Sequence, residues 1–457
     1  MEQLALSSDV SERIELLRQQ AEQEFDDDAE SIITQERYLA VSALLKSCYR
    51  KKQNNRLTMS DKIDKVVTNR FFALPIFALV MFLVYYLSIS TVGTMMTDWV
   101  NDVLFGEVIP PAVEGWLVSV NTADWLQSLI LDGVIAGVGA VLGFLPQMVV
   151  LFLLLALLED CGYMARIAFV MDKLLRKIGL SGRSIVPLLV GFGCTVPAVM
   201  ASRTLSSERD RRMTIMLTPF MSCSAKIPIY AVFAAAFFQK YAALVMIGMY
   251  LTGIIIGIIV ALIFDRTVFR GKPIPFVMEL PNYRFPSAKS VLLLMWDKAK
   301  DFLQRAFTII FLATVIIWFL QSFDSRLNVV TDSADSILAA IGHLLAPVFA
   351  PLGFNDWRIP TALITGFTAK EAVISTLGVL MGTSTAALGP ALHTLFTPVS
   401  AISFLVFTLL YTPCVAAIAA VKRELESGWL ALGVVILQCV VAWLAAFGVY
   451  LLLGLFV

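Results

Sequence analysis

Three cysteines stand among residues that break or loosen a helix, and they are the side chains best suited to chemistry. Cys194 lies in the run GFGCTVPAVM, Cys223 in PFMSCSAKIP and Cys414 in YTPCVAAIAAV. Borderline divalent cations accept thiolate, thioether, imidazole and carboxylate ligands. We therefore predict that three sulfur atoms from separate broken helices line one path for a metal ion. The alternative is a free cysteine buried as a small hydrophobe, and it is our interpretation of the other three: Cys48, Cys161 and Cys439.

The sequence around Cys223 also places polar groups inside an apolar segment. Ser222 and Ser224 flank the cysteine, and Lys226 follows shortly after. In hydrocarbon, a freed backbone N–H or C=O costs several kcal/mol unless protein or a wet cavity satisfies it. Broken segments that carry soft and charged groups at this depth are typical of transport sites. We predict that the two serines and the lysine belong to the transport path.

A second pair of charges is embedded in the apolar run GFTAKEAV, which holds Lys370 and Glu371. Charges inside a membrane usually face a cavity or a partner. Adjacent residues on a helix do not face each other, so we expect Lys370 and Glu371 not to pair. We predict instead that Glu371 contacts Lys226 and that all three line the path.

Two acidic residues, Glu159 and Asp160, follow ten unbroken apolar residues. They are therefore expected at the cytoplasmic end of a membrane span. One interpretation is an acidic vestibule for a cation, with Met164 as a soft ligand. The alternative is that both carboxylates are ordinary solvated charges at a helix end.

The composition sets the class of protein that must position these residues. Of 457 residues, 58% are hydrophobic and 15% charged, with a mean hydropathy of +0.80. A soluble protein could not keep so much apolar surface from water, so a membrane protein is predicted. Balanced charge, 35 basic and 35 acidic residues, offers no case for nucleic-acid binding. Without a GxSxG, metallopeptidase or GxxxxGK[ST] motif, we expect neither an enzyme nor a GTP site.

The apolar segments predict an all-α, polytopic membrane protein of about seven to nine membrane helices. A cytosolic helical segment, 1–70, precedes the first span. Its basic residues next to that span place the N-terminus in the cytoplasm. The acidic loop after the first span is expected outside. The candidate spans are 71–92, 129–158, 213–238, 242–264, 306–321, 399–421 and 428–456.

Two segments of the chain resemble each other and indicate an internal repeat. GLSGRSIVPLLVGFGCTVPAVMAS (179–202) is similar to GFNDWRIPTALITGFTAKEAVIST (353–376). Basic clusters on both sides of the first segment place its ends in the cytoplasm, whereas the second enters from outside. We predict two inverted, gate-like repeats with broken or re-entrant segments, in membrane halves 71–272 and 273–457. The alternative is likeness of composition alone.

At these motifs the chain resembles the bacterial ferrous iron transport protein B family. The runs that carry the resemblance are LEDCGYMARIAFVMDKLL, VPLLVGFGCTVPAVMASRTL, TPFMSCSAKIPIYAVFAAAFF, PIPFVMELPNYRF and GFTAKEAV. The resemblance implies uptake of Fe²⁺, as substrate, across the bacterial inner membrane through two gate-like halves. It also implies an N-terminal GTPase domain joined to the membrane part by a helical domain.

The chain departs from that family pattern at its beginning, where only the end of the helical domain is recognisable. We therefore expect coupling, if any, through a separate GTPase domain or small accessory cytosolic proteins, and a homo-oligomer is a further expectation. Two alternatives stay open. In the first alternative, the gate-like fold transports another divalent metal or another solute. In the second, the chain is a non-transporting remnant or scaffold.

Overall fold

The computed structural model describes residues 8–25, 29–48, 59–69, 71–205, 207–269, 283–326, 328–330, 333–383 and 388–455. The predicted boundary between the membrane halves, at residues 272 and 273, lies outside these ranges. The chain forms two compact units, Met1–Lys65 and Val66–Val457. The first unit contains α1 (Ser8–Phe25), α2 (Ala29–Cys48) and the start of α3 (Met59–Val67).

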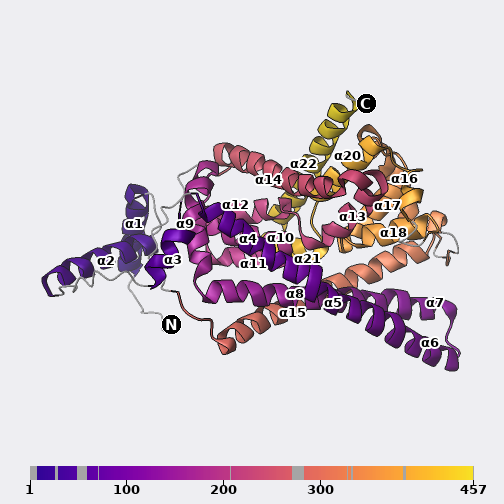
Figure 1. The fold of residues 1–457 in the computed structure, drawn as a ribbon, viewed down its shortest axis with the longest axis horizontal. Helices are drawn as coiled ribbons and strands as arrows, with labels where there is room; N and C mark the ends of the chain where they lie inside the picture. Colours follow the sequence, from indigo (N-terminus) through magenta and orange to yellow (C-terminus); the bar gives the residue numbers. More distant parts are fainter. Residues whose placement is uncertain are drawn as a thin grey trace. The chain divides into compact units, whose positions relative to one another are not determined.

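The second unit is built from helices, shown as ribbons in Figure 1. Across the described residues no strand forms, and the one isolated bridge joins Phe323 to Val329. Its helices are α4 (Ala73–Tyr85), α5 (Val92–Asp98), α6 (Ile109–Ser119), α7 (Asp124–Ser128), α8 (Ala136–Asp160), α9 (Tyr163–Leu175), α10 (Ile185–Gly193), α11 (Thr195–Ala201), α12 (Glu208–Leu217), α13 (Ile227–Phe237), α14 (Ala242–Thr267), α15 (Ala288–Ser322), α16 (Ile337–Phe349), α17 (Arg358–Thr368), α18 (Ala372–Leu380), α19 (Leu388–Leu392), α20 (Pro398–Leu410), α21 (Val415–Glu424) and α22 (Gly428–Gly454).

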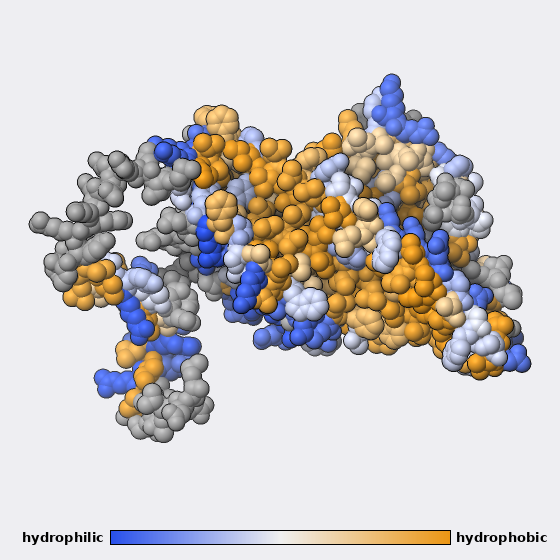
Figure 2. Space-filling model, turned by 60° about the horizontal axis from the view of Figure 1, so that its bottom comes forward, coloured by the Kyte–Doolittle hydropathy of each residue, from blue (hydrophilic) through white to orange (hydrophobic). Residues whose placement is uncertain are grey.

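Seven helical stretches of the described chain are long and apolar enough to cross a membrane. They are Ala73–Ser119, Trp125–Asp160, Glu208–Phe237, Gln239–Thr267, Ala288–Ser322, Pro398–Glu424 and Gly428–Gly454. The prediction of an all-α, polytopic membrane protein is therefore confirmed. Figure 2 shows hydrophobic side chains over much of this unit's visible face. Leu244, Ile247 and Leu451, each at least half exposed, belong on a surface that faces lipid rather than water.

The predicted external loop after the first span is wrong in one respect, because the chain stays helical there. From α4 the helix continues through α5 and α6 to Ser119, with π-helical segments at Tyr86–Thr91 and Trp99–Val108. Each π segment inserts an extra residue into the helical register, and the helix absorbs it without ending. α8 and α15 lie side by side along much of their length (Figure 1).

Helix caps fix where several spans begin. The Ser287 side chain accepts a hydrogen bond from Ser290 N at the start of α15, and Ser427 accepts one from Leu430 N at the start of α22. Thr397 and Ser400 form a reciprocal capping box at the start of α20. Pro398, between them, is the first residue of the helix. Such caps satisfy backbone donors that a helix start leaves without partners.

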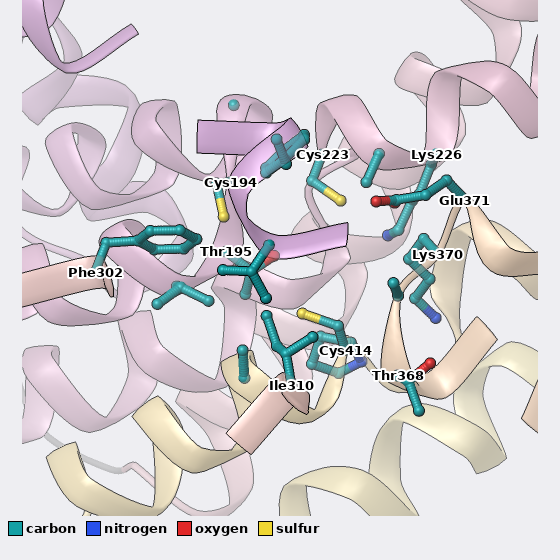
Figure 3. A pocket seen from close by; sticks show the side chains of 18 residues that line it. Cys194, Thr195, Cys223, Lys226, Phe302, Ile310, Thr368, Lys370, Glu371 and Cys414 are labelled. Carbon is teal, nitrogen blue, oxygen red and sulfur yellow. The ribbon is translucent and has the colours of Figure 1, made fainter. Parts of the chain in front are cut away.

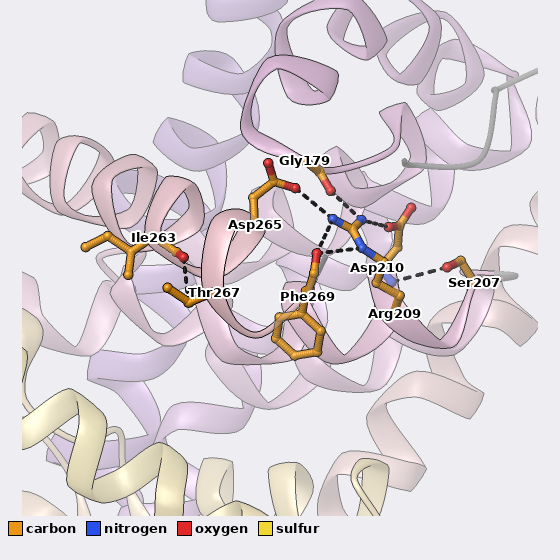
Figure 4. Close-up of polar contacts among 8 residues, drawn as sticks. All are labelled: Gly179, Ser207, Arg209, Asp210, Ile263, Asp265, Thr267 and Phe269. Atoms are coloured by element: carbon orange, nitrogen blue, oxygen red, sulfur yellow. Dashed lines mark hydrogen bonds and ion pairs between the residues drawn. The ribbon is translucent and has the colours of Figure 1, made fainter. Parts of the chain in front are cut away.

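A guanidinium ties three segments together at one end of the membrane unit (Figure 4). Arg209 of α12 donates to the carbonyl oxygens of Gly179 and Phe269 at 2.8 Å each, and to Asp265 of α14 at 2.8 Å. Gly179 has a φ of +79°, and a Cβ there would overlap the Asp265 carboxylate. The turn therefore requires glycine, because backbone and side chain both approach it closely.

Candidate functional site

The helix breaks predicted from the sequence exist, and they recur in the two halves. Between α10 and α11 the chain becomes extended at Cys194, with φ −153° and ψ 135°. Between α17 and α18 it becomes extended at Ala369, with φ −145° and ψ 132°. Nearly equal dihedrals at matching places in the similar segments support a structural repeat. The opposite orientation of the two repeats in the membrane stays a prediction.

A second type of break also recurs. Cys223 precedes the first turn of α13 with φ −78° and ψ 160°, and Cys414 precedes α21 with φ −61° and ψ 159°. Both cysteines thus occupy the extended position immediately before a helix restarts. Pro228 and Pro413 stand next to these restarts, where a missing N–H is tolerated or a helix cannot continue.

The three cysteines at these breaks line one cavity of about 70 Å³, which we call the central cavity. Figure 3 shows their sulfur atoms on the cavity, with the charged groups of Lys226, Lys370 and Glu371 to one side of them. The remaining lining is mostly apolar: Val141, Phe144, Gly193, Thr195, Val196, Ala225, Phe302, Ile310, Thr368, Ala369, Pro413 and Ala416. The sequence thus predicted the side chains that meet here, whereas their role stays a prediction.

The backbone groups freed by the breaks are satisfied by nearby side chains. Ser224 Oγ donates to the Gly193 carbonyl at 2.9 Å, which links the break at Cys194 to the break at Cys223. Ser222 Oγ lies 3.1 Å from Tyr230 Oη. Neither serine is part of the lining of the central cavity. Both serines therefore support the site from behind it, since their hydroxyl groups are used in these contacts.

Two buried lysine side chains donate to backbone carbonyl oxygens, one in the last turn of α20 and one in the break that follows this helix. Lys226 Nζ donates to the Leu409 carbonyl at 2.5 Å, and Lys370 Nζ donates to the Thr412 carbonyl at 2.7 Å. Lys370 Nζ also lies 3.0 Å from the centre of the Tyr411 ring. Each lysine is 2% exposed. For Lys226 this contact is favourable, because the last carbonyl oxygens of α20 carry the negative end of the helix dipole.

The expected contact between Glu371 and Lys226 is not an ion pair in this structure. Both residues line the central cavity, but among the described residues no ion pair within 4.0 Å joins them. The ammonium group is already engaged by the Leu409 carbonyl. Lys226 and Glu371 therefore both line the cavity, but the lysine is hydrogen-bonded to a backbone carbonyl and not to the carboxylate.

A larger cavity, about 470 Å³, lies between α8, α11 and α15, and we call it the vestibule. Glu159 and Met164 line it, as the acidic-vestibule interpretation requires. Asp160 does not: it is bonded to Arg284 and accepts from Ser287 N at 3.1 Å, at the start of α15. Asp160 follows Glu159 on the helix, so the two side chains point in different directions. The vestibule interpretation is therefore wrong for Asp160.

Sequence reasoning missed two acidic residues of the vestibule, Asp297 and Asp301 on α15. Their spacing of four residues places both on one helix face, and that spacing is the signal that was available. Lysines stand between them, at 298 and 300, and make the segment look basic rather than acidic. Lys298 donates to Glu159 at 2.8 Å, so part of the acidic charge is already balanced.

Within the described ranges, no three side chains of His, Cys, Asp or Glu come close enough together to hold a metal ion. The central cavity is therefore a lining with separate sulfur atoms rather than a closed metal centre. Cys161 and Cys439 lie outside the linings of both cavities. Cys161 Sγ donates to the Leu158 carbonyl, as expected for a cysteine used in packing.

Seven candidate spans, repeated helix breaks and a cavity at those breaks define a polytopic helical membrane protein of the transporter class. The Gate family, described as "Nucleoside recognition", matches residues 141–237 and 303–428. "Ferrous iron transport protein B C terminus" matches residues 246–298, and "FeoB cytosolic helical domain" matches residues 1–50. The chain belongs to the Fe(2+) transporter FeoB family.

Relatives from distant organisms align along most of the chain. The Fe(2+) transporter FeoB of Staphylococcus aureus (strain MSSA476) is 37% identical, covering 99% of this chain and 68% of the relative. The Fe(2+) transporter FeoB of Escherichia coli (strain K12) is 34% identical, and the alignment covers 93% of this chain and 62% of the relative. A Porphyromonas gingivalis "Fe(2+) transport protein A/Fe(2+) transporter FeoB fusion protein" is 37% identical, covering 93% and 55%. The chain thus spans about 55–68% of these relatives' lengths. No solved structure matches it.

Proposed function

We propose that this chain is the membrane part of a ferrous iron transporter and that Fe²⁺ crosses through the central cavity. One observation carries the proposal: Cys194, Cys223 and Cys414, from three separate helix breaks, line the same cavity. Fe²⁺ accepts thiolate ligands readily. The names of the relatives support iron as the substrate.

The charges around the cavity fit the passage of a cation. The ammonium groups of Lys226 and Lys370 are bound to backbone carbonyls at one side of the sulfur atoms, so their charge is partly compensated (Figure 3). Glu371 adds a carboxylate to the same lining. A partly dehydrated Fe²⁺ would therefore exchange water for sulfur and carboxylate oxygen as it moves between separate ligands. Weak, separate sites allow an ion to leave as well as to bind.

The vestibule forms the cytoplasmic end of this path. Its lining includes Arg203 and Lys298, and the positive-inside rule assigns the basic end of a membrane protein to the cytoplasm. We place the chain in the bacterial inner membrane with a cytoplasmic N-terminus. Energy coupling would come from a GTPase domain on a separate or longer polypeptide, and an accessory protein is suggested by the Porphyromonas fusion. The chain itself acts as a transporter and not as an enzyme.

Other substrates are less well matched. The Gate family description names nucleoside recognition, but the central cavity of about 70 Å³ is far below the roughly 300–1,000 Å³ of ordinary small-molecule sites. Sulfur ligands also suit Mn²⁺, Co²⁺ and Zn²⁺ to different degrees. Competition of these ions with Fe²⁺ would decide the selectivity, and a chain that passes none of them would be a non-transporting scaffold.

The proposal is tested by replacing each cavity cysteine with serine in proteoliposomes that contain a fluorescent Fe²⁺ indicator, with and without a separately added GTPase domain. We expect each of C194S, C223S and C414S to slow Fe²⁺ influx by about tenfold, equivalent to about 1.4 kcal/mol of barrier. The triple variant should approach the rate of empty vesicles.

The matched control is C439S, because Cys439 is a free cysteine on α22 outside both cavity linings. Its influx rate should equal that of the parent chain. Normal influx in a folded, monodisperse triple variant would remove the cysteine path. Equal loss in C439S would show that the effect comes from folding and not from the cavity.

A further inference from the structure

The central cavity and the vestibule share one lining residue among those described, Phe302 of α15. Its side chain is 5% exposed. In Figure 3 the phenyl ring stands at the end of the central cavity opposite Lys370 and Glu371, beyond Cys194. The ring therefore separates the sulfur-lined space from the acidic space.

Helix α11 shows that the two cavities follow each other along one line. Thr195 and Val196, at its start, line the central cavity, and Pro197 and Met200, within the next turn, line the vestibule. α11 also packs against α15, the helix that carries Phe302. One turn of helix rises about 5.4 Å, so a single aromatic side chain is enough to fill the distance between the two spaces.

We propose that Phe302 is the barrier of the transport path and that its displacement connects the central cavity to the vestibule. This inference rests on the proposed function and names the residue that controls passage within it. A hydrated cation cannot cross a packed phenyl ring, because the ring offers no ligand to replace water and leaves no room for it.

Phe302 lies on a helix whose apolar window is largely on the surface of the membrane unit. In the apolar window of α15, 6% of the residues are buried, the smallest share among the seven candidate spans. α15 packs mainly along α8, so a rotation or shift of α15 would move Phe302 relative to α11 at the cost of contacts with α8. Asp301 precedes Phe302 and lines the vestibule, so the same movement changes the position of an acidic group next to the barrier.

The test measures access to the cavity thiols and not iron transport. The full chain is reconstituted, and a positively charged, membrane-impermeant methanethiosulfonate reagent is added from the vestibule side. Modification of Cys194, Cys223 and Cys414 is followed by peptide mass spectrometry. We expect F302A to accelerate modification by about tenfold or more over the parent chain, F302L to give an intermediate rate, and F302W to remain as slow as the parent.

Two variants with the same loss of volume serve as controls. Phe152 lines only the vestibule and Phe144 lines only the central cavity. F152A and F144A should therefore stay within about twofold of the parent rate. Equal acceleration in F302A and F152A, or no acceleration in F302A and F302L, would overturn the proposal. Should F302A fail to fold, the order of F302L, parent and F302W still decides it.

The thiol-access test of Phe302 and the Fe²⁺ influx test of the proposed function can fail independently of each other. Normal Fe²⁺ influx in the cysteine triple variant would refute the cysteine path and leave the thiol-access result to stand by itself. Unchanged thiol access in the Phe302 variants, together with lost influx in the cysteine variants, would refute the barrier alone.

Discussion

At the residue scale, the site depends on how backbone groups freed by the helix breaks are satisfied. Ser224 illustrates this, because its hydroxyl donates to the Gly193 carbonyl and lies behind the cavity rather than in its lining. A Cβ at Gly193 would overlap Leu151 Cδ2, so the leucine side chain would have to move to make room for it. A hydroxyl on one break and a carbonyl on the other thus link the chain next to Cys223 to the chain next to Cys194.

Replacing Ser224 with alanine should destabilise the membrane unit without abolishing transport by the molecules that stay folded. The change leaves the Gly193 carbonyl without its partner in a buried site, which costs about 1–3 kcal/mol. Thermal unfolding in detergent measures the loss. The control is S119A, because the exposed Ser119 hydroxyl donates to Trp116 O at 2.6 Å and water can replace it. Equal melting temperatures for S224A and S119A would contradict this role.

Residue types predicted the charged and sulfur-bearing part of the cavity lining, but not the rest of it. Cysteine and lysine in apolar sequence are unusual enough to be noticed, and Cys194, Cys223, Cys414 and Lys370 are all in the lining. Phe302 could not be noticed, because a phenylalanine in an apolar run has no distinguishing signal before the fold places it between two cavities. The direction of Asp160 likewise depends on helix phase, which its neighbourhood in the sequence does not define.

At the element scale, an ion pair joins the turn after α11, in the first half, to the end of α21, in the second half. Arg203 Nε donates to Glu424 Oε2 at 2.8 Å, and its guanidinium also contacts Oε1. The Glu424 side chain is 4% exposed, whereas that of Arg203 is 45% exposed. The hydrogen bonds to Glu424 raise the pKa of Arg203 above its usual value. This pair links the turn after α11 to the last turn of α21.

A double-mutant cycle on Arg203 and Glu424 should give a coupling energy of about 1.5–3 kcal/mol, because the pair is bidentate and one partner is buried. R203A should cost more than E424A, since it leaves a buried carboxylate without compensation. Free energies of unfolding of the parent, both singles and the double variant provide the measurement.

The comparison pair for this cycle is Arg212 and Glu208, which are bonded four residues apart on α12 with both side chains exposed. Its coupling should be about 0.3–0.5 kcal/mol. Similar coupling energies for the two pairs would show that burial of Glu424 adds nothing to the link between the turn after α11 and α21.

Elements were predictable where hydrophobic length alone decides them. Each of the candidate spans read from the sequence overlaps one of the seven in the structure. The ends of the helices were less predictable, because a helix continues through polar residues unless a capping residue stops it. Thus α15 begins at Ala288, well before the apolar run at 306, and the first span runs on to Ser119 through its π segments.

At the scale of the whole molecule, the orientation that we propose for the path rests on the distribution of charge. Arg203 and Lys298 line the vestibule, and Lys298 belongs to α15. The turn after α15 forms the opposite end of that span. There the backbone N–H groups of Asn328 and Arg326 donate to Asp324 and hold its pKa below the usual range, so this turn keeps its hydrogen bonds at neutral pH.

Labelling of single cysteines at the two ends of α15 should therefore reveal opposite sides of the membrane. Ser325, exposed in the turn after α15, is replaced with cysteine, and so is Lys289, exposed in its first turn. At pH 7 in intact cells, an impermeant maleimide should label S325C, whereas K289C should react only after the membrane is permeabilised. The parent chain provides the background from its own cysteines. The reverse pattern would place the vestibule outside, and the path proposed for Fe²⁺ would then begin at its acidic end, with Phe302 as the first barrier the ion meets.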